Sequence, residues 1–172
     1  MTDKDLPPNP YRHDGACPFE CCTYRQWKTR SAVRLHESID SPAIVAEVPA
    51  GVSVGGLTGE VRVEPQPYAV LEDNGALKAG DLIFFLDNVG EGCVNYWYHG
   101  KLNPDLGLNE GLLFYLYDGC QPNTARMKGA CSLRKLRPEN TFMNDWWGKI
   151  RYQGKEGWVL NTGQFDNVDA CG

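Results

Sequence analysis

The sequence predicts an all-β protein made of two small barrels, one of them nested in the other, with little helix. Short runs that alternate apolar and polar residues, as at 32–37 and 60–64, are typical of half-buried strands. Nineteen glycines and eleven prolines among 172 residues indicate many turns, and therefore short strands. Helical periodicity is scarce, and the best candidate for a helical turn is the short stretch 133–137, which Pro138 ends.

The elements follow one another closely along the chain. Residues 1–23 form a Pro- and Cys-rich arm, for which we expect an extended conformation. Strands are expected wherever an alternating or apolar run lies between turn residues such as Pro49-Ala50-Gly51 or the Asn74-Gly75 step. The expected strands are 32–37, 44–48, 52–54, 60–64, 68–71, 82–86 and 94–98, followed by a hairpin at 146–159.

The predicted hairpin near the C-terminus is the most informative stretch. It contains Trp146 and Trp147, an alternating strand, the turn Gly154-Lys155-Glu156-Gly157, and a second strand that contains Trp158. Successive side chains of a strand point to opposite faces of the sheet. We therefore expect one of the paired tryptophans in the core, and the other exposed or in a groove.

A weak internal repeat predicts two barrel-like units. The sequence 98–101 (YHGK) parallels 152–155 (YQGK), and each ends an aromatic strand at a hairpin. We expect a second unit at 68–102, nested within a discontinuous barrel that comprises 24–67 and 103–172. A tandem arrangement of 24–102 and 103–172 is the alternative.

These motifs occur in an order that resembles bacterial SH3 domains (SH3b). The segments that carry the resemblance are 33–35, 45–51, 147–152 and 154–159, and the closing hairpin is the most specific of them. The resemblance implies SH3-like barrels with long insertions. It also implies a module without catalysis of its own that binds cell-wall peptide or a partner protein.

Seven cysteines favour a disulfide framework, and hence an exported protein, periplasmic or extracellular, although no signal peptide is visible. Cys120 and Cys131 are candidates for a local bridge. Cys171 is a candidate partner of Cys21 or Cys22, in a bridge that would close a loop of about 150 residues. The alternative is a metal-stabilised structural protein, with a site formed by His13, Cys17, Cys21 and Cys22, although these lack the paired CxxC spacing of zinc sites.

The net charge of −5 is spread over both signs without basic clusters, which argues against nucleic acid as a partner. No apolar run approaches the roughly 18 residues that a membrane-spanning helix requires. The sequence therefore favours a peptide, a cell-wall component or a partner protein as the ligand.

We expect a binding module without cofactor or catalytic residues, in which an aromatic groove holds the ligand. A competing hypothesis is a small thiol hydrolase in which Cys93 pairs with His99 across a hairpin. The residues expected to line the groove are Trp146, Trp147, Tyr152, Trp158, Tyr96 and Tyr98.

Overall fold

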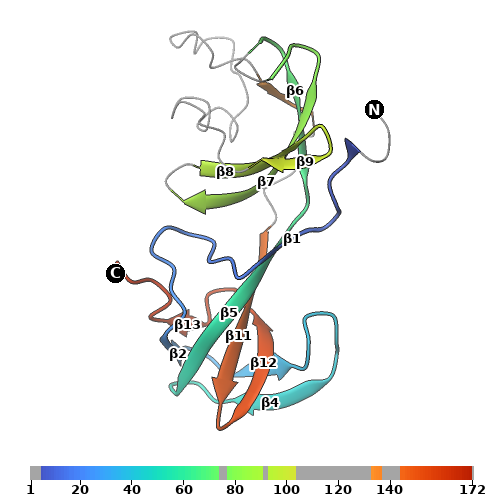
Figure 1. Cartoon of the computed structure of the whole chain (residues 1–172). Helices are drawn as coiled ribbons and strands as arrows, with labels where there is room; N and C mark the ends of the chain where they lie inside the picture. The colour runs from blue at the N-terminus through green and yellow to red at the C-terminus, as the bar shows by residue number, and fades with distance from the viewer. Residues whose placement is uncertain (1–4, 74–76, 91–92, 104–132, 137–143, 172) are drawn as a thin grey trace. The chain divides into compact units, whose positions relative to one another are not determined.

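The computed structural model describes residues 5–73, 77–90, 93–103, 133–136 and 144–171 (Figure 1). The prediction of an all-β protein is confirmed, because the described residues form a curled half-barrel sheet of eight strands and a second sheet of five. Leu133–Lys135 is a strand, so the expected helical turn at 133–137 was wrong. Among the described residues, no helix has the length and apolar character needed to cross a bilayer.

The chain divides into two compact units. The first comprises Met1–Tyr11 and Val63–Met143, and the second comprises Arg12–Arg62 and Asn144–Gly172. The second unit is thus interrupted in sequence by the first. These boundaries differ from the expected ones at residues 67 and 103, because 103–143 is grouped with the first unit.

The large sheet carries the C-terminal hairpin, whose strand β12 pairs with the N-terminal strand β3 through Trp158 and His36. Its strand order is β13-β2-β5-β11-β12-β3-β4, and β1 also pairs with β5. Figure 1 shows β11 running beside the long strand β5. The strands are β1 (Tyr11–Asp14), β2 (Gln26–Thr29), β3 (Val33–His36), β4 (Ile44–Val48), β5 (Ser53–Val63), β11 (Asn144–Tyr152), β12 (Lys155–Leu160) and β13 (Phe165–Asp166).

The core of the second unit is built around Trp27, whose side chain is fully buried. Its ring centroid lies 5.8 Å from that of Trp146 and 5.3 Å from that of Phe165. Glycines on two strands make room for the indole, because a Cβ atom at Gly56 would lie 2.8 Å from the Trp27 ring and one at Gly148 would lie 3.0 Å from it. β5 therefore runs unbroken through 55–56, where the sequence had predicted a break between two strands.

Two disulfides tie the N-terminal arm of the second unit. Cys17 is bonded to Cys22, and Cys21 is bonded to Cys171 across a sequence separation of 150 residues. The predicted pairing of Cys171 with Cys21 or Cys22 is confirmed. The three cysteines of the metal-site hypothesis, Cys17, Cys21 and Cys22, are all engaged in these bonds, and a bonded cysteine is not a thiolate ligand. Cys120 and Cys131 lie outside the described residues.

The small sheet belongs to the first unit and has the order β10-β6-β7-β8-β9. Its core consists of Tyr68, Val70, Leu77, Ile83, Phe85, Tyr96 and Leu133. The strands are β6 (Gln66–Val70), β7 (Leu82–Gly90), β8 (Cys93–Tyr98), β9 (Lys101–Asn103) and β10 (Leu133–Lys135).

Candidate functional site

The hairpin β11–β12 separates the two adjacent tryptophans onto opposite faces of the large sheet. Trp146 is only 8% exposed and packs in the core, where its indole N–H donates to the Tyr24 hydroxyl at 3.1 Å. Trp147 points to the outer face and is half-buried. Trp146 therefore does not line a groove, and Trp147 is the outward member of the pair.

A second tryptophan lies on the same outer face. Trp147 is paired with Leu160, and Lys149 is paired with Trp158, in the register of the two strands. Trp147 and Trp158 are therefore diagonal neighbours across the strand pair, close enough for their rings to share one surface.

This surface continues onto strands β3 and β4. His36 is in register with Trp158 on one side and with Ile44 on the other. The His36 ring lies edge-on to the Trp147 ring with centroids 5.9 Å apart, and Ile44 is 41% exposed. We call the set Trp147, Trp158, His36 and Ile44 the outer aromatic surface.

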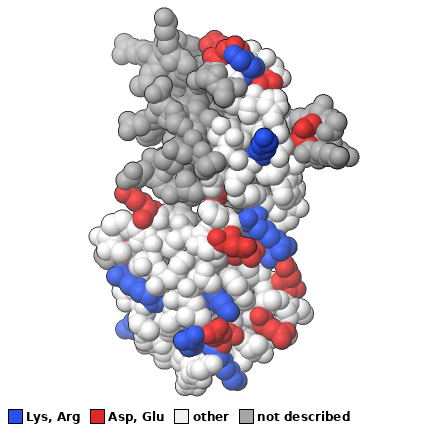
Figure 2. All heavy atoms as spheres, viewed as in Figure 1, with Lys and Arg blue, Asp and Glu red and all other residues white. Residues whose placement is uncertain are grey.

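Charged side chains of both signs border the outer aromatic surface. Glu156 accepts from Arg151 at 2.5 Å and pairs with Lys149 at 3.1 Å, and the hydrogen bond from Arg151 is the main reason that the Glu156 pKa is lowered. Figure 2 shows basic and acidic groups interspersed among uncharged atoms on the visible face. The local field is therefore mixed in sign, unlike the concentrated positive charge that nucleic acid requires.

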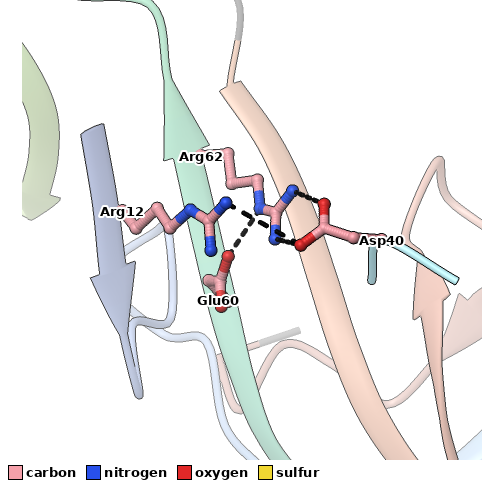
Figure 3. A network of polar contacts seen from close by, with 4 residues as sticks. All are labelled: Arg12, Asp40, Glu60 and Arg62. Carbon is pink, nitrogen blue, oxygen red and sulfur yellow. Dashed lines mark hydrogen bonds and ion pairs between the residues drawn. The ribbon is translucent and has the colours of Figure 1, made fainter. Parts of the chain in front are cut away.

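A loop held by arginines runs from β3 to β4. Asp40, in this loop, accepts two hydrogen bonds from Arg62 of β5, at 2.5 and 3.0 Å, and lies 3.7 Å from Arg12 of β1 (Figure 3). Arg62 also pairs with Glu60 at 2.5 Å, and both of these side chains are largely buried, with exposures of 14% and 13%. The hydrogen bonds from Arg62 are the main cause of the lowered pKa of Asp40.

This loop, residues 37–43, acts as a strap across the sheet. Strands β11 and β12 lie between β3 and β5 in the strand order, and the loop that follows His36 nevertheless brings Asp40 to Arg62 of β5. In Figure 3 the Asp40–Arg62 pair lies in front of β11. The His36 ring contacts the strap, because its Nδ1 lies 3.1 Å from the Ser41 carbonyl oxygen. The strap thus borders the outer aromatic surface.

The remaining predicted groove residues lie elsewhere. Tyr96 is in the core of the first unit, where burial raises its pKa. Tyr98 is also in the first unit, where burial and its hydrogen bond to the Asp81 carboxylate raise its pKa to about 12. Tyr152 ends β11 and lines a separate hollow of the second unit. The six predicted residues therefore do not form one groove.

Strand β8 places the two residues of the Cys93–His99 hypothesis at its opposite ends. Cys93 opens this strand, and His99 follows its last residue, in a turn with a φ of 50°. Six residues of extended chain separate their Cα atoms by about 20 Å.

The sequence prediction missed His36 and Ile44 as members of the surface. The alternation of Val33, Arg34, Leu35 and His36 already placed His36 on the solvent side of its strand. The partners across β12 depend on the strand order, which one sequence does not reveal.

Comparison with known proteins gives no relative: no family model, curated protein or solved structure matches this chain significantly.

Proposed function

We propose that the second unit is a non-catalytic binding module whose outer aromatic surface binds a peptide segment of a partner protein. The observation that carries this proposal is the diagonal pair Trp147 and Trp158, half-buried on the outer face beside His36 and Ile44. Tryptophan is enriched among the residues that dominate binding energy at protein interfaces. The order of motifs that resembles bacterial SH3 domains supports the same class of function.

The surroundings of the surface suit a peptide. The flanking groups Lys149, Arg151 and Glu156 offer both hydrogen-bond donors and acceptors to a polar backbone. Trp147 and Trp158 stand on paired strands and are already half-buried, so binding costs little side-chain ordering.

The disulfides Cys17–Cys22 and Cys21–Cys171 favour an oxidising compartment. We propose the periplasm or the cell exterior as the location of the protein. The partner would then be exported as well.

Phage selection with a library of random peptides on the immobilised protein tests the proposal. The selected peptides are then measured by titration calorimetry against Trp147→Ala and the matched variant Trp97→Ala, which truncates a half-buried tryptophan of the first unit. Loss of a hot-spot tryptophan costs about 2 kcal/mol or more, so Trp147→Ala should weaken binding about 30-fold, and Trp97→Ala should not.

A parallel pull-down with insoluble peptidoglycan distinguishes a cell-wall ligand from a peptide. Equal binding of the selected peptides by wild type and a folded Trp147→Ala variant would refute the proposal. Retention on peptidoglycan, with no peptide selected, would replace the peptide by a cell-wall fragment.

A further inference from the structure

A polar hollow opens on the second unit at the tip of the hairpin β11–β12, separate from the outer aromatic surface. Its volume is about 570 Å³. It is lined by Arg25, Gln26, Ser53, Gly55, Gly56, Leu57, Arg151, Tyr152, Gln153 and Gly154. Strands β2, β5 and β11 therefore all contribute to its walls.

No side chain covers the floor of the hollow, because residue 55, whose side chain would project into it, is a glycine. Gly55 is in register with Gln26 and lies next to Arg151, whose Cβ would be 3.9 Å from a Cβ at position 55. The nearest atom to that added Cβ, the Gln26 amide nitrogen, would be 3.6 Å away, which is an ordinary contact. Close packing therefore does not require glycine at position 55, and its effect is to leave the hollow open.

The charge around the hollow is positive although the whole chain carries −5. Two arginines and no carboxylate are among its lining residues. Arg25 donates to two neutral carbonyls, Asn167 O at 3.0 Å and Asp169 O at 2.7 Å, so no carboxylate offsets its charge in these bonds. Arg151 shares the single carboxylate of Glu156 with Lys149.

The arginines are also held in place before any ligand arrives. The two carbonyl bonds fix the guanidinium of Arg25, and Glu156 Oε1 accepts from both Nε and Nη2 of Arg151. A pre-ordered guanidinium loses less side-chain freedom on binding and suits the two oxygens of an oxyanion.

We propose that this hollow binds the oxyanion group, carboxylate or phosphate, of a small organic ligand. Arg25 and Arg151 hold the charged group above Gly55. The ring of Tyr152 and the amides of Gln26 and Gln153 contact the uncharged part. The site adjoins the peptide site proposed above and shares Arg151 with it, but it contains none of the four residues of the outer aromatic surface.

NMR titration of the ¹⁵N-labelled full chain tests the proposal at low salt. Three probes share one ring and differ in charge: glucuronate carries a carboxylate, glucose 6-phosphate carries a phosphate, and glucose is neutral. We expect saturable shifts of the Gly55 and Gly154 amide signals with one or both anions and none with glucose. The anion that binds more tightly identifies the oxyanion class.

Variants then assign the binding to the hollow. Gly55→Val fills the floor with a good strand residue, and Arg151→Gln removes one guanidinium; each should weaken binding about tenfold or more. The matched control is Arg30→Gln, because Arg30 is 59% exposed and pairs with Asp166 at 2.5 Å, while Arg151 is 56% exposed and pairs with Glu156 at 2.5 Å. This control should bind like wild type.

One further variant gives a change of opposite sign. Glu156→Gln removes the negative charge beside Arg151 and Lys149 but keeps a side-chain oxygen that can accept from Arg151, so it should tighten anion binding several-fold. The proposal is overturned if neither anion shifts these amides. It is equally overturned if Gly55→Val, with an unchanged melting temperature, binds the anion as tightly as wild type.

Discussion

The disulfide between Cys21 and Cys171 is expected to contribute a large part of the stability of the second unit. The double variant Cys21→Ser/Cys171→Ser removes this bond without leaving a thiol beside the Cys17–Cys22 bridge. The single variants are less suitable, because a free Cys21 thiol would lie next to Cys22 in sequence and could exchange with it.

The size of the effect follows from the loop that the bond closes. The sequence separation is 150 residues, and in the chain-entropy model this corresponds to about 5 kcal/mol at 25 °C. If the first unit, 63–143, stays folded while the second unfolds, the flexible part of the loop is shorter. The logarithmic dependence on length then lowers the expected loss only to about 4.4 kcal/mol.

Urea unfolding followed by tryptophan fluorescence measures this loss. We expect the midpoint to fall and the slope of the free energy against urea to rise somewhat, because the unfolded chain without the bond is less compact and exposes more surface. A double variant within about 1 kcal/mol of wild type would refute the reasoning. Mass spectrometry of the wild type without reductant checks that the bond is formed in the sample.

Three further predictions concern the strap, a glycine and a tyrosine. Asp40→Asn weakens the contact with Arg62, so hydrogen exchange should become faster in the strap alone. The pKa of Asp40 is lowered in the folded protein, so the wild type should show the same change only as the pH falls below the ordinary value of 3.8. Fast exchange of the wild-type strap at neutral pH would contradict this. Gly157→Ala should destabilise the second unit by about 1–3 kcal/mol in urea unfolding, because the added Cβ would lie 2.7 Å from the Cβ of Leu35. An unchanged midpoint would show that the strands can move apart. The pKa of Tyr98 is raised to about 12, so its neutral form favours the folded state. The free energy of unfolding should therefore fall as the pH rises from about 10 to about 12. A Tyr98→Phe variant with the same decline would assign the effect to another group.

Local patterns in the sequence were enough to predict the closing hairpin and the opposite placement of its paired tryptophans. Both follow from the two-residue period of a strand, which acts over neighbouring positions. The sequence also offered Cys21 and Cys22 as candidate partners of Cys171, and the structure pairs Cys171 with Cys21.

Features that depend on contacts between distant segments were not predictable. The glycines at 55–56 signalled a break, whereas Gly56 in fact lets β5 continue over the ring of Trp27. The strand with Tyr96 and Tyr98 has the same pattern as the C-terminal hairpin, an aromatic strand that ends at a turn. Tyr96 nevertheless packs in the core of its own unit. The pairing of Asp40 with Arg62 joins the loop after β3 to β5, with two strands between them in the sheet order, and no local pattern encodes it.

The proposed peptide site is tested most directly by the indole N–H signals of the five tryptophans when a selected peptide is added. Binding on the outer face should shift the signals of Trp147 and Trp158, while those of the buried Trp27 and Trp146 stay nearly in place. A peptide that binds and shifts only the Trp97 signal, or none of the five, would contradict the account.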